Sequence, residues 1–438
     1  MRVFCSLESK GGRRLRRCNA AVRLLSAARR EHRVMRFPRT AATNLALALL
    51  LLASSPGARA QSLADAFEQA WLRNPLASSL EARQDEALAR IDLADRLVPG
   101  APAASLAAQG DRFHRDEGAQ KWEMELGVPL WLPGQQSARQ AEARSLQEQV
   151  QAQRPLLRLA LAGEVRTRWW ALAAARTARE LALRRVQTAR ELESSVMRRF
   201  ETGDLARLDA NLARNERLAA EAEAVQAQAS VQAQEASLRA LTGVEAPPVL
   251  EGEAAAVQSI APEEHPQWVA ARAAARAADA TLLATLKSDR AAPRVALRME
   301  RDRGASAEPF SNAVGVQVSI PFSWEPQVRQ QTAAARAERL RAEAELATTR
   351  LRLQTVVDTA RAELEAVERQ LRIASARQAA TADNLRLAER SFSLGETDLT
   401  SLLRVRATAL EADLFAARQR VSLEAARSQL NQALGVVP

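Results

Sequence analysis

The sequence predicts a mainly α-helical chain with a small β part, in which one unit of helix, two strands and a long helical hairpin occurs twice. The duplication is visible because Phe200 and Gly203 recur as Phe392 and Gly395, 192 residues further on. Each unit contains two short stretches in which apolar and polar residues alternate, as in strands. The region Gln327–Leu394 contains neither Gly nor Pro, which favours one very long helix.

The basic charge of the chain belongs to its first 60 residues, which hold 13 Lys and Arg but only 2 Asp and Glu. The remainder holds 49 Lys and Arg and 50 Asp and Glu. A basic start at Met35, an apolar run over Leu45–Ala53 and small residues before Gln61 are typical of a secretory leader. We expect residues 1–60 to be leader and signal peptide, with translation from Met35 and cleavage after Ala60. The nearly neutral remainder argues against nucleic-acid binding.

Both cysteines, Cys5 and Cys18, lie before the expected cleavage point. The mature chain would therefore have no disulfide, no thiolate nucleophile and no cysteine-bound metal. No cysteine follows the apolar run, which argues against lipid attachment there. Beyond the leader, no run of 18 apolar residues predicts a transmembrane helix, although an exported protein can also cross a membrane as strands.

Other anchors of the duplication lie at nearly the same offset. They pair Pro129 with Pro321, Gly243 with Gly435, and Asn74-Pro75 with His265-Pro266. A repeat of this size indicates duplication of a whole domain. We therefore divide the mature chain into a first structural repeat over 61–243, a linker over 244–263 and a second structural repeat over 264–438.

Four segments are predicted as strands: Ala101–Asp111, Lys121–Leu130, Arg294–Asp302 and Ala313–Pro321. In the second, Trp122, Met124, Leu126 and Val128 alternate with Glu123, Glu125 and Gly127. A strand between lipid and a wet lumen needs this alternation, and about ten tilted residues span a bilayer. A half-buried strand of a soluble sheet would show the same pattern, so both interpretations stay open.

Long antiparallel coiled-coil hairpins follow the strands. The second has a heptad seam with a partner row three residues later: Val357, Leu364, Leu371, Leu385 and Phe392, then Ala360, Val367, Ala374, Thr381 and Ala388. Gly203 and Gly395 are predicted to reverse the two hairpins, because glycine leaves the helical conformation most readily. Pro155 predicts a kink or a join in the first hairpin.

The chain has a leader, "NP" near the mature start, and a duplicated helix-strand-strand-helix-helix unit with "VPL" or "IPF" before an Ala/Arg-rich helix and an F-x-x-G turn. This ordered set resembles the TolC-like outer-membrane efflux protein family. The resemblance covers Gln61–Pro438 and implies a homotrimer in the cell outer membrane. In it, each chain gives four strands to one 12-stranded transmembrane β-barrel, continuous with a periplasmic trimeric α-barrel. The implied partners are a periplasmic adaptor, or membrane fusion, protein, an inner-membrane transporter and outer-membrane lipid.

The resemblance also implies site residues at the hairpin ends. Tip and adaptor-docking positions are Gly203, Asp204, Asp209, Gly395 and Glu396, and channel-constriction positions are Phe392, Asp398, Ser401 and Arg404. The best-known member of the family has aspartates six and nine residues after the second glycine, where this chain has Ser401 and Arg404, so a carboxylate ring is not expected there. Glu396 and Asp398 could supply a negative ring instead, but helix capping also explains both.

Other polar and aromatic residues suggest no reaction site. His114 and His265 have no ligand spacing and are expected at the surface rather than in a metal site. Trp169 and Trp170 are expected to pack between helices. Aromatic residues near strand ends fit a membrane interface or ordinary packing equally well: Trp122, Trp131, Phe310, Phe322 and Trp324.

The sequence therefore predicts a passive outer-membrane exit duct of a tripartite efflux system, without catalysis, cofactor or metal. By resemblance, the exported substrate leans slightly towards heavy-metal cations, with drugs, solvents and secreted polypeptides as alternatives. A periplasmic adaptor and a soluble coiled-coil scaffold are the alternative functions. An adaptor is expected to have one hairpin per chain, and a scaffold leaves the alternating strands unexplained.

Overall fold

The computed structural model describes residues 62–113, 117–254 and 261–438. The predicted leader, with the Met35 start, the cleavage after Ala60 and both cysteines, lies outside these residues, as does His114. The account below concerns the described residues of the unit that begins at Gly57.

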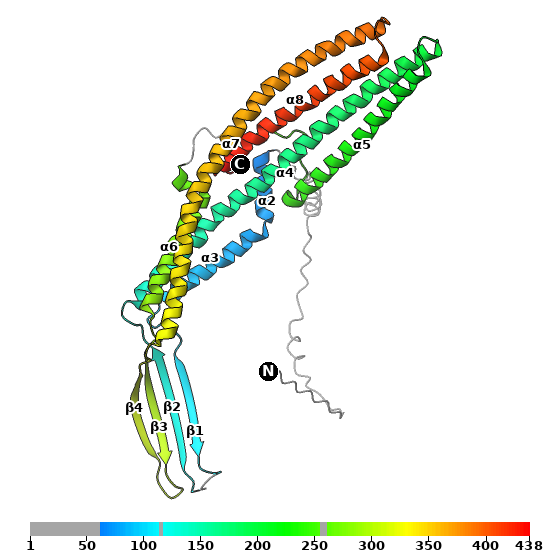
Figure 1. Cartoon of the computed structure of the whole chain (residues 1–438). Coiled ribbons are helices and arrows are strands. Elements are labelled where there is room, and N and C mark those ends of the chain that lie inside the picture. The colour runs from blue at the N-terminus through cyan, green and yellow to red at the C-terminus, as the bar shows by residue number, and fades with distance from the viewer. Residues whose placement is uncertain (1–61, 114–116, 255–260) are drawn as a thin grey trace, which may run out of the picture. The chain divides into compact units, whose positions relative to one another are not determined.

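The same order of elements occurs twice along the chain (Figure 1). The first series is α2 (Leu63–Arg73), α3 (Pro75–Ala94), β1 (Ala103–Gly110), β2 (Gln120–Pro129), α4 (Gln135–Glu201) and α5 (Arg207–Thr242). The second is the 3-10 turn η1 (Pro262–Glu264), α6 (Pro266–Lys287), β3 (Arg294–Arg303), β4 (Ser311–Ser319), α7 (Glu325–Ser393) and α8 (Leu399–Ala433). The predicted fold class, mainly helical with a small β part, is confirmed.

Two long hairpins, α4 with α5 and α7 with α8, make up most of the protein. The predicted heptad seam explains the second one, because every seam position of α7 from Val357 to Phe392 is buried or half-buried against α8. Alanines such as Ala360 and Ala374 in this seam let the two helices approach closely. Gly203 and Gly395 reverse the chain with positive φ angles of 86° and 80°, as predicted.

The helices form a layer whose neighbours run in the order α5, α4, α8, α7 towards the hairpin ends. Nearer the strands, the contacts run from α3 through α4 and α6 to α7. Helices α5 and α3 therefore lie at one edge of the layer and α7 at the other.

The four strands form one antiparallel sheet in the order β1-β2-β3-β4. The pairing of β2 with β3 joins the two repeats and sets Glu123 opposite Glu300 and Leu126 opposite Leu297. Strands β1 and β4 are the two edges. The predicted strand boundaries agree with the observed ones to within about two residues.

The main hydrophobic core lies where α2 crosses α4, α5 and the end of α8. Phe67 and Trp169 are fully buried there, and Trp169 donates a hydrogen bond from Nε1 to the Glu251 carbonyl at 3.2 Å. Trp170 donates to the Ser428 hydroxyl at 2.8 Å, which ties α4 to α8. The prediction that Trp169 and Trp170 pack between helices is confirmed.

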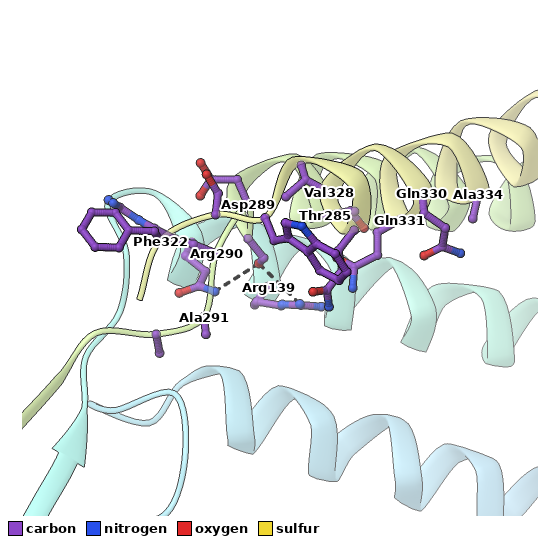
Figure 2. A pocket seen from close by; sticks show the side chains of 16 residues that line it. Arg139, Thr285, Asp289, Arg290, Ala291, Phe322, Val328, Gln330, Gln331 and Ala334 are labelled. Atoms are coloured by element: carbon purple, nitrogen blue, oxygen red, sulfur yellow. Dashed lines mark hydrogen bonds between the residues drawn. The ribbon is translucent and has the colours of Figure 1, made fainter. Parts of the chain in front are cut away.

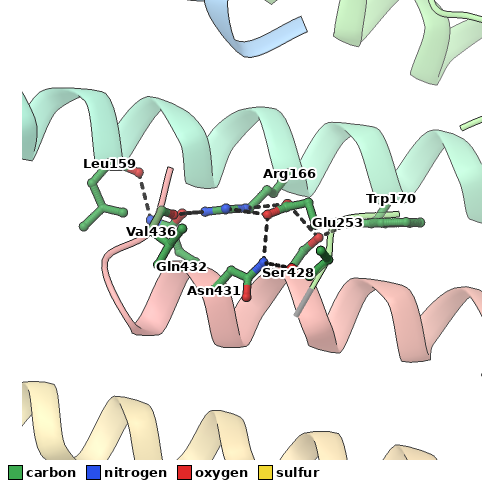
Figure 3. Close-up of polar contacts among 9 residues, drawn as sticks. Leu159, Arg166, Trp170, Glu253, Ser428, Asn431, Gln432 and Val436 are labelled. Carbon is green, nitrogen blue, oxygen red and sulfur yellow. Dashed lines mark hydrogen bonds and ion pairs between the residues drawn. The ribbon is translucent and has the colours of Figure 1, made fainter. Parts of the chain in front are cut away.

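A buried ion pair fastens the linker to both hairpins (Figure 3). Arg166 of α4 donates to both carboxylate oxygens of Glu253, at 2.8 and 2.6 Å, and their side chains are only 3% and 10% exposed. Glu253 also accepts from Ser428 at 2.9 Å and from Asn431 at 3.0 Å, both on α8. We call these residues the waist network.

Of the two predicted alternatives at Pro155, a kink or a join, the join is wrong, because α4 runs without a break from Gln135 to Glu201. The kink stays a prediction. Pro155 is exposed, so water can satisfy the Gln151 carbonyl that loses its helical partner.

Candidate functional site

The tip of the first hairpin is a short reversal closed by local hydrogen bonds. Asp209 accepts the backbone N–H of Ala206 at 3.1 Å and so completes the cap of α5. Asp204 accepts the Thr202 hydroxyl at 3.1 Å. A Cβ built on Gly203 would meet nothing within 4 Å, so the positive φ rather than crowding requires glycine there.

The tip of the second hairpin repeats this design with different caps. The Asp398 carboxylate accepts the Ser401 N–H at 3.3 Å as the N-cap of α8. Glu396 accepts the Ser391 hydroxyl at 3.1 Å. Gly395 is as open as Gly203. The capping explanation for Asp398 therefore has direct structural support, whereas Glu396 stays exposed and available to a partner.

A small apolar cluster holds the two tips together. Phe392 is its centre, only 6% exposed, among residues of all four hairpin helices such as Val196, Ala210 and Leu402. The Arg199 guanidinium lies 5.0 Å from the centre of the Phe392 ring and donates to the Phe392 carbonyl at 3.0 Å. Within one chain, the Phe392 ring therefore packs against the neighbouring hairpin, and its place at a channel constriction stays a prediction.

The other constriction candidates lie at the N-cap and in the first two turns of α8. Asp398 and Arg404 are exposed and Ser401 is half-buried. The hydrogen bond from the Ser401 hydroxyl is the main cause that holds the pKa of Asp398 below its ordinary value, and Arg404 adds a smaller electrostatic contribution. The start of α8 therefore presents one anionic and one cationic group to its surroundings.

The sheet has two chemically different faces. One face is apolar and strongly exposed, with side chains that are 47–72% accessible: Leu106, Trp122, Met124, Leu126, Leu297, Met299, Val314, Val316 and Val318. The opposite face carries ion pairs, in which Lys121 contacts Glu123 of its own strand at 2.8 Å and Glu300 of β3 at 2.7 Å. So large an exposed apolar surface marks a lipid or protein contact.

A polar pocket of about 680 Å³ lies where the sheet joins the helices (Figure 2). Arg139 reaches into it and donates to Ser288 at 3.4 Å. At its rim, Phe322 and Trp324 are 90% and 69% exposed. Continuing the alternation of β4 puts both aromatic rings on the apolar side of the sheet, as in an aromatic belt.

The remaining strand-end aromatics pack locally. Trp131 donates from Nε1 to the Arg96 carbonyl at 3.0 Å. Phe310 lies beneath the guanidinium groups of Arg301 and Arg303, at 4.4 and 4.8 Å from the ring centre.

Metal ligation finds no support among the described residues, where no group of three or more His, Cys, Asp and Glu could hold an ion. The expectation that His265 lies at the surface is wrong. It is 5% exposed and covered by the C-terminal segment, which tertiary packing brings to it. None of the helices between residues 62 and 438, in the parts described, is long and apolar enough to cross a membrane.

Residues 258–436 match the family model for the outer membrane efflux protein. This match covers about two fifths of the chain, so this part of the chain is similar to the outer membrane efflux protein family. The family resemblance predicted from the sequence is thereby confirmed, and the outer-membrane location agrees with the description of the family. No curated protein sequence matches the chain significantly.

Solved channel structures share the fold of most of this chain. The CmeC outer membrane channel of Campylobacter jejuni has a TM-score of 0.70 at 13% identity, over 86% of both chains. The outer membrane protein VceC of Vibrio cholerae has a TM-score of 0.69 at 17% identity, over 85% of this chain and 96% of its own. The open-state MtrE outer membrane channel of Neisseria gonorrhoeae has a TM-score of 0.67 at 16% identity, over 85% of this chain and 89% of its own.

Proposed function

We propose that this outer membrane efflux protein is the passive exit duct of a tripartite efflux system. One observation carries the proposal: the sheet exposes a continuous apolar face on one side and a charged face on the other. Strands of 8–10 residues are long enough to cross a bilayer when tilted. The apolar face would contact outer-membrane lipid and the charged face would line water.

The open edges of the sheet support assembly into a ring. Four strands cannot close a barrel, since membrane barrels need about eight or more. Strands β1 and β4 are free to pair with other copies of the chain, and the helix layer has its own edges on the same two sides. In a head-to-tail ring, one edge of each copy contacts the opposite edge of the next copy, so the sheet edges and the helix-layer edges are both covered. Three copies, the number that the family resemblance implies, would give 12 strands.

The edge helices also carry apolar side chains that a neighbouring copy would cover. On α7 and just beyond it, Ile373, Leu387 and Leu394 are 54–67% exposed and lie at heptad spacing. On α5, Leu218 and Val225 are 49% and 73% exposed and also lie seven residues apart. Each row can serve as one half of an interhelical seam between copies.

The hairpin tips would meet a periplasmic adaptor protein and close the duct at rest. Gly203, Asp204, Gly395 and Glu396 are exposed at the reversals, and Asp209 is half-buried behind them. Asp398, Ser401 and Arg404 at the start of α8 are our candidates for the constriction. In this scheme the inner-membrane transporter supplies the energy, and the duct needs no catalytic residue and no cofactor.

For the exported cargo we favour heavy-metal cations over drugs, solvents and polypeptides. The support is the short strand-strand loops and the lack of a cysteine after the apolar leader run, two features that lean towards that branch of the family. The growth of a deletion strain on metal salts and on drugs is compared with the growth of the same strain carrying the restored gene. The compounds against which the gene protects identify the class of cargo. Protection against drugs alone would contradict the assignment.

A matched pair of substitutions tests the orientation of the sheet. Val316 and Gln317 are neighbours near the middle of β4, and Val316 lies on the apolar face. Arginine on a lipid-facing site at the bilayer midplane costs about 2–4 kcal/mol, so Val316→Arg should sharply reduce the protein recovered from outer membranes. Gln317→Arg, facing water, should leave the yield unchanged. Equal yields from the two variants would contradict a lipid-facing apolar sheet.

A further inference from the structure

His265 is the N-cap of α6 and is buried. Its Nδ1 atom accepts the backbone N–H of Gln267 at 3.1 Å, and the residue is only 5% exposed. An imidazole nitrogen accepts a hydrogen bond only when it carries no proton, so this cap requires the neutral ring with its proton on Nε2.

The first repeat shows the same cap built from a group that does not titrate. Asn74 stands before Pro75 as His265 stands before Pro266, and its Oδ1 accepts the Leu76 N–H at 2.9 Å. The two helices α3 and α6 therefore begin alike, with a side chain that bonds the amide two residues on. Only the second cap can be altered by a proton.

The surroundings of His265 disfavour a charged ring. A Cβ on Gly435 would lie 2.7 Å from Cδ2 and 3.0 Å from Nε2, so the C-terminal segment covers the imidazole closely. Nε2 is buried without a hydrogen bond of good geometry. Burial lowers the pKa of His265 below its ordinary value, and the Ala433 carbonyl opposes this only in part.

Charged groups face His265 from two of the elements around it. Glu263 and Glu264 of η1 directly precede it in the chain, and Asp358 and Arg361 of α7 line the same pocket of about 540 Å³ as His265. The α8 side of that pocket contributes the apolar Ala433 and Leu434. All four charged side chains are exposed to water, which weakens their effect on the ring.

We propose that His265 is an acid-sensitive latch that holds the start of α6 and the C-terminal segment in place at neutral pH and releases them in acid. Protonation would put an N–H on Nδ1 opposite the N–H of Gln267, so the cap would be lost. It would also place a charge beneath Gly435. Because α6 packs on α4 and α7, the release would loosen the base of the second hairpin. This inference is independent of the proposed function.

The direction of the effect follows from proton linkage. The unfolded chain takes up a proton near the ordinary histidine pKa of about 6.5, whereas the folded chain resists it. The stabilisation from neutral His265 is therefore complete above about pH 6.5 and is lost as the pH falls through the lower pKa of the folded state.

Hydrogen-deuterium exchange of the full-length detergent-solubilised protein at pH 7.5 and 5.0 tests the latch. After correction for the intrinsic pH dependence, exchange of the first turns of α6 should be about fivefold faster at pH 5.0, the effect expected for a lost N-cap. The start of α3, capped by Asn74, should not change. Unchanged protection of α6 would overturn the proposal.

Two reciprocal variants complete the test. His265→Asn installs the cap of the first repeat and should abolish the pH response of α6. If this variant still responds to acid, the sensitivity lies elsewhere and the proposal fails. Asn74→His should confer the response on α3, which gives a second test should His265→Asn not fold. No gain of response in α3 would mean that a protonated histidine still caps the helix, which also overturns the proposal.

Discussion

Replacing Glu253 with glutamine removes the anion of the waist network and leaves its cation in place. Arg166 would keep its hydrogen bonds to the Gln432 side chain, at 2.5 Å, and to the Val436 carbonyl, at 3.0 Å. Both are neutral, and the Arg166 side chain is only 3% exposed. The variant therefore holds a guanidinium charge that is buried and no longer compensated.

The expected cost follows from that burial. Breaking a buried ion pair by removing one partner costs about 3–5 kcal/mol. An unfolding entropy of about 2.1 cal/mol/K per residue over ~380 mature residues gives about 0.8 kcal/mol/K, so Glu253→Gln should lower the melting temperature by about 4–6 °C. Because the waist network joins the linker to α4 and α8, the loss should be felt by the whole protein.

The assay is thermal unfolding followed by circular dichroism, in one detergent and at one protein concentration. The matched control is the double variant Arg166→Met with Glu253→Met, which removes both charges and keeps apolar volume. It should be less destabilised than Glu253→Gln alone, because no unpaired charge stays buried. A single variant as stable as the parent, or a double variant that is no more stable than the single one, would refute the reasoning.

The same carboxylate predicts a pH dependence. Burial alone would raise the pKa of Glu253, but hydrogen bonds from Arg166 and Asn431 outweigh it and hold the pKa below its ordinary value. Its contribution to stability is therefore present above the unfolded pKa, about 4.3 for glutamate, and is lost as the pH falls through the lower folded value. The melting temperatures of parent and Glu253→Gln should converge in that acid range.

Three further substitutions probe the tips. Gly395→Val should strain the reversal, since a β-branched residue at φ 80° costs about 1–2 kcal/mol, and should impair efflux without dissociating the assembly; unchanged efflux would mean that the tip is misplaced. Gly395→Asn, which tolerates that conformation in open space, is its control and should retain efflux. Arg404→Asp should change the conductance or cation preference of the closed channel in planar bilayers, and no change would move Arg404 away from the constriction.

Local chemistry explains why much of the fold could be predicted from sequence. Gly203 and Gly395 must reverse their hairpins, because each interrupts a long helical pattern and takes a positive φ. The strands were predictable because the alternation of apolar and polar residues can be seen within a single segment of sequence. The heptad seam of α7 was predictable for the same reason, because its repeat also lies within one segment. Duplication strengthened the reversal and strand signals by presenting each of them twice.

Tertiary contacts account for what the sequence did not reveal. His265 was expected at the surface, but Gly435, 170 positions later, packs on its ring. Phe392 carries a seam position, and the sequence does not reveal that the other hairpin, through Arg199, covers the same ring. No sequence pattern marks Glu253, because a single carboxylate in a linker becomes structurally important only through its ion pair with Arg166, 87 residues away.

The central claim, that several copies of this chain share one membrane duct, is tested most directly by native mass in purified outer membranes. The protein is expressed with its leader and extracted in mild detergent, and the mass of the assembly is measured by native mass spectrometry or light scattering. The account predicts a detergent-dependent trimer in the outer-membrane fraction. A monomer or dimer recovered from the periplasm without detergent would contradict it, because the apolar sheet face and the open edges would then need another explanation.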